Sequence, residues 1–257
     1  MNETINLLNN RVSLRKYSDK NISEEHLNLI LEGAMKAPTA GNMMLYSILV
    51  IKDKETKKKL SVTCDNQPFI ANSSVILIFL ADMQKWFDFY THSYVEQFCE
   101  ENKLDFSGPD EGDFILSAED AIIAAQNAVI TAESLNIGSC YIGDIIENYE
   151  IHKEMFNLPK WVAPIAMLCM GYYPEDYKRI ITPRFDKEYV VFNEKYQRLS
   201  SEDFNEMFKS KQSKVVSGNI YNAKNFGQLM YARKTGSEFS KEMTRSIKLM
   251  LSQWKKA

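Results

Sequence analysis

Two arginines and a serine near the start of the chain are spaced so that they could bind an anion. They lie in the segment Arg11-Val12-Ser13-Leu14-Arg15. In an extended chain, alternate residues share one face, so two guanidinium groups and a hydroxyl would converge. Arg offers a rigid fork of donors that keeps its charge, which suits a phosphate group. The pattern predicts a phosphate-binding face, with a solvated basic loop as the alternative.

Two further segments could approach a planar ligand. The sequence APTAGN at 37–42 is a turn in which Pro and Gly shape the backbone, while Thr39 and Asn42 offer donors and acceptors. The sequence IGSCYIGD at 137–144 reads as a Gly-bracketed loop, where Gly lets a ligand come close to the backbone amides. The alternatives are an ordinary capped turn at 37–42 and a simple helix C-cap at Gly138.

Several other chemistries are excluded by their missing motifs. The chain has no G-x-G-x-x-G, no G-x-S-x-G and no C-x-x-C, and the GSCYIG run is followed by Asp144 rather than by the Lys of a P-loop. The cysteines and histidines are scattered and show no metal-ligand spacing, and no His is singled out as the partner of a Cys nucleophile. These residues are Cys64, Cys99, Cys140, Cys169, His26, His92 and His152. We expect no metal site.

The elements around these segments follow from hydrophobic periodicity. Residues 23–34 predict a helix with Ser23 as N-cap, ending before the 37–42 turn. Residues 82–104 predict an aromatic-rich helical segment, and residues 241–254 a final helix. Continuous apolar, β-branched runs predict buried strands. These strands are 45–51, 74–81 and 161–170.

Residues 117–135 predict the longest helix, with Ser117 and Asp120 as its start signal and Gly138 just past its end. The helix is apolar nearly all round. A helix with no polar face is buried centrally or lies in a subunit interface.

Composition and charge place the chain among soluble globular proteins. Of its 257 residues 45% are apolar and 25% charged, and the longest apolar run, 75–81, is far short of the ~18 residues that span a bilayer. No apolar signal segment is seen at the N-terminus, so we expect a cytoplasmic protein without a membrane partner. The net charge of −3 divides into +9 for residues 209–257 and −12 for the rest. We expect this basic tail to dock on the acidic body, with nucleic-acid or membrane binding as the alternative.

Taken together, five segments resemble the nitroreductase family of FMN-dependent oxidoreductases, in order and spacing, over most of residues 5–195. They are RxSxR at 11–15, APTAGN at 37–42, AESLNIGSCYIG at 132–143, the strand running into MGY at 170–172, and PR at 183–184. YARK at 231–234 and EMTRS at 242–246 resemble an extension found in longer members. The resemblance implies an α+β fold with a central, mostly antiparallel sheet flanked by helices, in an intertwined homodimer with FMN at the interface.

The resemblance also implies which residues bind FMN. Arg11, Ser13 and Arg184 would hold the phosphate. Arg15 would lie near the N1/O2 edge of the flavin, where a fixed positive charge favours hydride uptake. The remaining FMN contacts would be Pro38, Thr39, Ala40 and Asn42 from the other subunit, Asn66 or Gln67 at the pyrimidine ring, and the backbone amides of Ile142 and Gly143 toward N5 and O4.

The activity implied is reduction of quinones, nitroaromatics or similar small electron acceptors by NADH or NADPH, in a ping-pong mechanism that needs no catalytic side chain. Residues 1–200 would form the FMN-binding domain, and 201–257 a basic extension that packs on the dimer. The alternatives are a specialised flavoenzyme of the same fold, such as a reductive dehalogenase or a flavin-consuming enzyme, and a non-enzymatic binding protein.

Two positions depart from the family pattern. Met43 and Met44 follow Asn42 where members often carry Gln-Pro, which leaves softer and less polar surroundings. Thr182 stands where a Lys often precedes the Pro-Arg pair. Phosphate binding would therefore depend more on Arg11 and Arg184.

Overall fold

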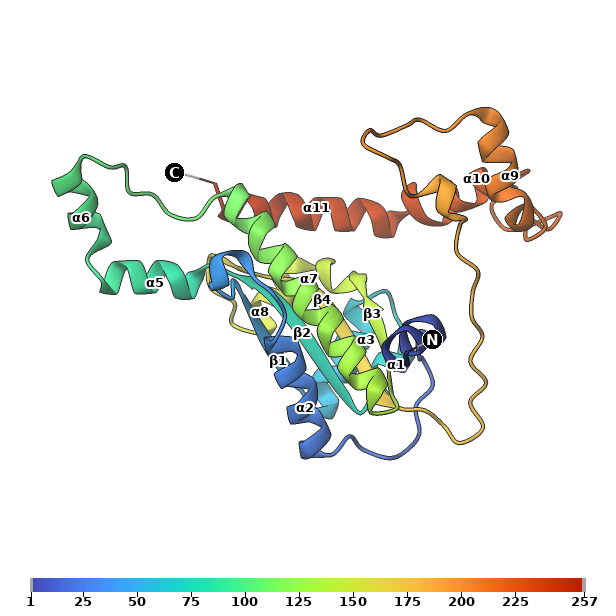
Figure 1. Ribbon diagram of the computed structural model, residues 1–257, viewed down its shortest axis with the longest axis horizontal. Coiled ribbons are helices and arrows are strands. Elements are labelled where there is room, and N and C mark those ends of the chain that lie inside the picture. The colour runs from blue at the N-terminus through green and yellow to red at the C-terminus, as the bar shows by residue number, and fades with distance from the viewer. Residues whose placement is uncertain (1, 256–257) are drawn as a thin grey trace. The chain divides into compact units, whose positions relative to one another are not determined.

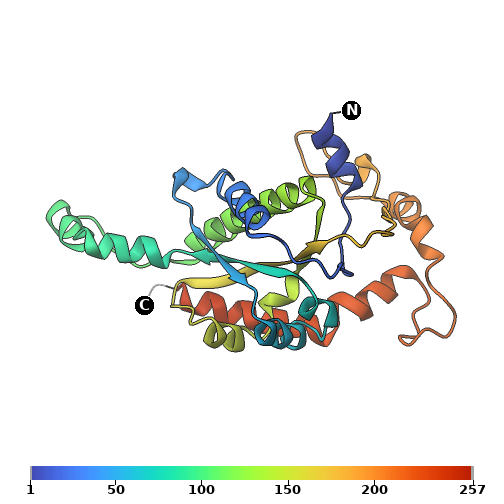
Figure 2. The ribbon, with the colours of Figure 1, turned by 90° about the horizontal axis from the view of Figure 1, so that it is seen from below.

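The computed structural model describes residues 2–255, which form two compact units (Figures 1 and 2). The first unit consists of residues up to 179 together with those from 243 onward, and the second is 180–242. The expected boundary near residue 200 therefore does not coincide with this division. Apolar residues of the final helix pack into the first unit. Their periodicity in the sequence indicates that they are buried, but not against which part of the chain.

A four-stranded antiparallel sheet is the centre of the first unit. Its strands are β1 (Tyr46–Ile51), β2 (Val75–Asp82), β3 (Ile137–Ile142) and β4 (Val162–Tyr172), in the order β1-β2-β4-β3. Tyr46 lies opposite Ala81 at one end, and Ser139 lies opposite Met170 at the other. The predicted strands at 45–51, 74–81 and 161–170 are thus confirmed to within two residues.

Helices cover both faces of the sheet (Figure 2). One layer contains α2 (Glu24–Met35) and α7 (Glu111–Ser134), which bury Ile30 and Val129 against Leu77 and Phe79 of β2. The opposite layer contains α3 (Lys54–Thr63), α4 (Pro68–Ala71), the 3-10 turn η2 (Gly143–Ile146) and α8 (Tyr149–Met155). Every residue of β2 is buried, because alternate side chains enter opposite layers. This explains the uninterrupted apolar run in the sequence.

The start of α7 differs from the prediction. The helix begins at Glu111, where Asp110 and Asp113 form a reciprocal capping box, and not at Ser117. Ser117 lies inside the helix and donates its hydroxyl to the carbonyl of Asp113. Two capping patterns follow each other closely, and the earlier one starts the helix. For α2 the prediction is confirmed, because the Ser23 hydroxyl accepts the N–H of His26 at 3.2 Å.

The aromatic-rich segment at 82–104 is helical, as predicted, but it is interrupted and forms two helices. They are α5 (Gln84–His92) and α6 (Val95–Asn102), separated at Tyr94, which has a left-handed backbone with φ of 57°. Tyr94 and Phe98 are well exposed, and so is Leu104 just beyond α6. The first unit also contains α1 (Glu3–Asn10) and the 3-10 turn η1 (Ala40–Asn42).

The predicted loop at 137–144 is instead strand β3 followed by η2. Asn136, with φ of 56°, takes the left-handed position that follows the helix. Gly138 lies inside the strand, where an added Cβ would come within 2.5 Å of Leu14 and 2.8 Å of Tyr173. Its role is therefore close packing, and the C-cap interpretation is wrong.

The second unit and the final helix make up the rest of the chain. The second unit contains η3 (Lys187–Tyr189), α9 (Ser201–Gln212), α10 (Phe226–Met230) and the π-helical turn η4 (Tyr231–Thr235). Helix α11 (Glu238–Gln253) begins there and continues into the first unit. Met250 and Trp254 are fully buried beside Leu45, Phe114 and Tyr149. This confirms a docked face at the end of the predicted helix.

Helix α7 is long and apolar enough to cross a membrane by length and composition, the one such helix among the described residues. It packs instead against α2 and the sheet as a core helix, with ten buried residues. Its exposed apolar side chains are Ile115, Leu116, Ile122 and Ile123, and the polar side chains of Glu119 and Gln126 are exposed on the same helix.

Candidate functional site

The segment 11–15 runs beside the edge strand β3. Ser13 forms a parallel bridge with Ser139, and the N–H of Leu14 donates to the carbonyl of Ser139 at 2.9 Å. Val12 and Leu14 are buried, whereas Arg11 and Ser13 are half-buried and Arg15 is exposed. The alternation expected from an extended chain is therefore present, and it leaves the two guanidinium groups and the hydroxyl on the outer face.

The two arginines give this edge of the sheet a positive potential. Within residues 2–255, neither Arg11 nor Arg15 forms an ion pair with a carboxylate. Burial raises the pKa of the Cys140 thiol, and both guanidinium groups oppose that rise. Arg11 and Arg15 thus lie within electrostatic reach of one side chain of β3. Two cations without a carboxylate partner suit a phosphate or another anion.

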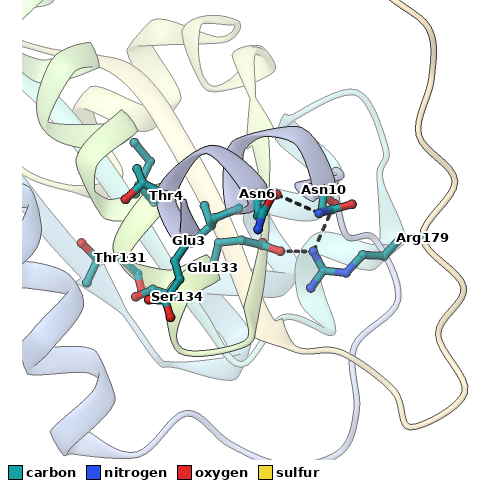
Figure 3. A pocket seen from close by; sticks show the side chains of 10 residues that line it. Glu3, Thr4, Asn6, Asn10, Thr131, Glu133, Ser134 and Arg179 are labelled. Atoms are coloured by element: carbon teal, nitrogen blue, oxygen red, sulfur yellow. Dashed lines mark hydrogen bonds and ion pairs between the residues drawn. The ribbon is translucent and has the colours of Figure 1, made fainter. Parts of the chain in front are cut away.

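A buried carboxylate holds the residue that precedes Arg11. Glu133, at the end of α7, accepts the Tyr173 hydroxyl and pairs with the Arg179 guanidinium, which also donates to the carbonyl of Asn10 at 3.1 Å (Figure 3). A cavity of about 600 Å³ lies beside this cluster, between α1 and the end of α7. It contains no predicted flavin ligand. The cluster positions the start of the 11–15 segment, and sequence reasoning missed it because its members are far apart in the chain.

Asn66 and Gln67 are the two amide side chains expected near the pyrimidine ring of the flavin. Only the Gln67 side chain is held by hydrogen bonds among the described residues. Its amide nitrogen donates to the Asp144 carboxylate at 2.8 Å and to the carbonyl of Cys64 at 3.0 Å. The amide oxygen has no partner among the described residues, so it can accept an N–H from a ligand. Asn66 is exposed in a left-handed conformation.

Asp144 links Gln67 to the end of β3. Ile142 is the last residue of that strand and is buried, so it can offer only its backbone to a ligand. Gly143 is exposed, and an added Cβ there would meet no atom within 4 Å. Open space beside a glycine backbone is what the approach of a flat ring requires.

The turn at 38–42 is held by the carboxylate of Asp120, which the sequence analysis interpreted as part of a helix start signal. The Asp120 carboxylate accepts the N–H of Ala40 at 2.9 Å and that of Leu45 at 3.0 Å. The Thr39 hydroxyl accepts the N–H of Met44 at 3.2 Å. Pro38 and Asn42 stay exposed, so the turn presents its surface to the outside.

One chain does not bring the turn and the arginines together. The turn precedes β1, and the 11–15 segment borders β3, so they lie at opposite edges of the sheet. Three strand spacings separate those edges by about 14 Å. The two groups also lie at opposite ends of the strands, since Tyr46 is level with Ala81 and Ser13 with Ser139. Within one chain, the turn and these two arginines are therefore far apart.

Arg184 belongs to the second unit, where it is exposed. Within the described residues it forms no ion pair. Its role at a phosphate stays a prediction.

The histidines and cysteines show no constellation for chemistry. No group of three or more His, Cys, Asp or Glu residues between 2 and 255 could hold a metal ion. His152 is buried between the carbonyl of Ile145 at 2.9 Å and the Thr63 hydroxyl at 2.8 Å. Burial raises the pKa of the thiols of Cys64 and Cys169, which keeps them protonated and unreactive.

Comparison with known proteins gives consistent results. The sequence signature of the Nitroreductase family matches residues 8–172. A Bacillus subtilis protein named FMN reductase [NAD(P)H] is 33% identical over 76% of this chain and 75% of its own length. An NADPH-dependent oxidoreductase of Staphylococcus saprophyticus is 29% identical over 74% and 73%.

A solved structure extends the likeness to nearly the whole chain. B. megaterium NfrA1 is 28% identical and superposes with a TM-score of 0.76, over 97% of this chain and 98% of its own. The likeness therefore includes the region beyond residue 172.

Proposed function

Since this chain belongs to the nitroreductase family and is an oxidoreductase, we propose that it binds FMN and uses NADH or NADPH to reduce quinones, nitroaromatics or related electron-poor acceptors. The observation that carries the proposal is the pair of arginines beside β3 that have no carboxylate partner among the described residues, together with the open backbone of Gly143 just after the same strand. The names of the Bacillus and Staphylococcus relatives support the choice of flavin and nicotinamide.

The described residues fit FMN in three respects. Arg11 and Ser13 supply a cation and a hydroxyl for the phosphate, and Arg184 would add a second cation. The free amide oxygen of Gln67 suits an N–H donor of the pyrimidine ring, which favours Gln67 over Asn66. The amides of Ile142 and Gly143 would face the other edge of the ring.

Bound FMN supplies the hydride-transfer chemistry. The side chains of this protein therefore need only bind and orient the flavin and stabilise its negative charge when it is reduced. Arg15 would keep a permanent positive charge near the N1/O2 edge and favour the reduced, anionic flavin. Nicotinamide and acceptor would use the same open face in turn, by a ping-pong mechanism. Such use of one face needs no catalytic acid or base, and no side chain is assigned that role.

The shared site requires a homodimer. Pro38, Thr39, Ala40 and Asn42 would reach the flavin from the partner subunit, because within one chain they lie at the far edge of the sheet from Arg11. The apolar side chains exposed on α7, with Ile122 half exposed, offer a surface for the partner. We place the dimer in the cytoplasm and expect the segment 201–257 to pack on it.

The test is to purify the full chain and titrate it with FMN. We expect a yellow protein that oxidises NADH or NADPH in the presence of a quinone or nitroaromatic. Arg11→Ala and Arg184→Ala should each weaken FMN binding about tenfold to a hundredfold, because a charge-assisted phosphate contact contributes roughly 1.5–3 kcal/mol. Arg15→Ala should mainly slow reduction of the flavin by NAD(P)H.

Arg245→Ala is the matched control, because Arg245 pairs with Glu150 on a different part of the unit, at 2.6 Å. It should leave FMN affinity unchanged. Unaltered FMN affinity in both phosphate variants would show that the phosphate assignment is wrong.

A further inference from the structure

A second cationic site borders the residues assigned to the flavin and shares Arg15 with them. A cleft of about 700 Å³ opens between three segments of the first unit: residues 15–21, the first turns of α3 at 54–58, and the turn 71–74 before β2. Its volume is that of a small-molecule site. The cationic side chains that line it are Arg15, Lys16, Lys20, Lys54, Lys57 and Lys58.

The cleft has a large excess of positive charge. Its acidic lining residues are Asp19 and Glu55, so six cations face two carboxylates and the formal balance is +4. None of the six cations forms an ion pair within residues 2–255. The chain as a whole carries −3, so this local excess is a feature of the site and not of the composition.

Lys57 shows that the charge is built into the fold. It is 6% exposed, and its ammonium group donates to the carbonyl of Ser73 at 2.6 Å and to that of Ser74 at 3.4 Å. Burial and the neighbouring charge of Lys54 lower the pKa of Lys57, and Asp53 acts in the opposite direction. Burying a cation without a carboxylate partner costs free energy that an anion in the cleft would offset.

The neighbouring groups do not neutralise this charge. The Asp53 carboxylate caps α3 and accepts the N–H and the hydroxyl of Thr56, at 2.7 and 2.8 Å. The ammonium group of Lys20 lies over the ring of Tyr172, 4.7 Å from its centroid. The N-terminus of the ten-residue helix α3 adds the positive end of its dipole at the same place.

We propose that this cleft binds a small polyanion, a molecule with two or more adjoining phosphate groups. Lysine presents a compact point charge on a flexible side chain. A cleft lined by lysines therefore prefers ligands with closely spaced negative charges and is less selective for their shape. A single phosphate would engage only part of the cations that surround the cleft. Single-stranded nucleic acid fits less well, because Tyr17 is the one aromatic residue among those that line the cleft, and successive bases would need several rings to stack on.

The experiment titrates the full chain, with FMN added in excess, with inorganic tripolyphosphate in a calorimeter at low and at high salt. We expect saturable binding that weakens as salt rises, tighter than binding of inorganic phosphate, with no change in flavin absorbance. Lys54→Glu and Lys58→Glu should each weaken binding about tenfold, since each replaces an attraction by a repulsion of similar size. A protein without FMN would still report on the cleft, so this result is independent of the proposed function.

Lys59→Glu is the matched control, because Lys59 is the exposed neighbour of Lys58 on α3 and does not line the cleft. It should keep the affinity of the unaltered protein. Melting temperatures provide a second readout: tripolyphosphate should raise that of the unaltered protein and of Lys59→Glu more than those of the two cleft variants.

Four results would overturn the proposal. One is absence of tripolyphosphate binding to the unaltered protein, and another is an equal loss in Lys59→Glu, which would indicate diffuse surface charge. The third is displacement of FMN, which would place the anion at the flavin phosphate. Tighter binding of a short RNA through Lys54 and Lys58 would instead identify the cleft as part of a nucleic-acid surface.

Discussion

Asp120 lies in the middle of α7, and its carboxylate holds the turn that precedes β1. The bonded N–H groups of Ala40 and Leu45 are 80 and 75 residues away in sequence. Sequence reasoning interpreted Asp120 as part of a helix start signal, because a local pattern carries no information on such distant partners. In contrast, the position of Arg11, Ser13 and Arg15 on one face could be inferred from a short extended segment alone.

Asp120→Asn should destabilise the protein by about 1–3 kcal/mol, because the N–H of either Ala40 or Leu45 loses its acceptor. It should also weaken FMN binding, since the 38–42 turn loses its anchor. Urea denaturation and FMN titration measure the two effects. The control is Glu119→Gln, an exposed neighbour on the same helix. Equal stability of the two variants would contradict a structural role for Asp120.

His152 makes stability depend on pH. Burial lowers its pKa, and a neutral ring donates through Nδ1 to the carbonyl of Ile145 while Nε2 accepts from Thr63. A group whose pKa is lower in the folded state binds fewer protons there than in the unfolded chain. Stability should therefore fall as pH drops below the unfolded value of about 6.5, by up to about 1.4 kcal/mol per pH unit.

Chemical denaturation between neutral and mildly acidic pH measures this slope. His152→Gln should lose that part of the dependence, whereas His92→Gln should keep it, because His92 is exposed. A slope that persists in His152→Gln would assign the effect to other groups.

At the scale of elements, the sequence predicted three buried strands correctly. It did not predict where the aromatic-rich helical segment breaks or where α7 begins. The strands follow from apolar runs that two helical layers require. The break at Tyr94 and the true start of α7 depend on single backbone conformations and on competing caps. Strand β3 was hidden because Gly138 lies inside it and Gly143 directly follows it, and its pairing with β4 is a tertiary contact.

The end of α11 is an element whose docking can be tested by one substitution. Trp254 is fully buried and packs edge-on against Phe114, with ring centroids 5.2 Å apart. Trp254→Ala should cost about 3–5 kcal/mol, as for other large aromatic residues removed from cores. Trp254→Phe should cost much less, since it keeps a ring and removes an indole N–H that has no partner. Thermal denaturation compares the two, and an Ala variant as stable as the parent would refute the docking.

At the scale of the whole molecule, the predicted flavin ligands fall into groups that one chain keeps apart. The arginines border β3 and the 38–42 turn borders β1. From its residues alone, the sequence pointed to a subunit interface only through the apolar helix 117–135, and the proposed dimer would use the side chains exposed on α7. The charge contrast between body and tail could not reveal where the second unit begins, because α11 contributes basic residues to both.

If the proposed dimer forms through α7, Ile122→Glu should convert it to a monomer and lower FMN affinity, because a charge would be buried in the proposed interface. Sedimentation velocity and FMN titration check this outcome. Val62→Glu is the control, since Val62 is 60% exposed on α3 and Ile122 is 50% exposed on α7. A stable FMN-loaded monomer of the unaltered chain would refute the shared site.

The route of the chain through the second unit affects how the protein would respond to proteolysis. Residues 180–242 leave the first unit at Arg179, and the chain rejoins it at Met243, where Met250 and Trp254 anchor the final segment. A single cut between these two points would therefore leave both fragments attached to the same body. The nicked protein would behave as one particle under native conditions and separate into two polypeptides only when denatured.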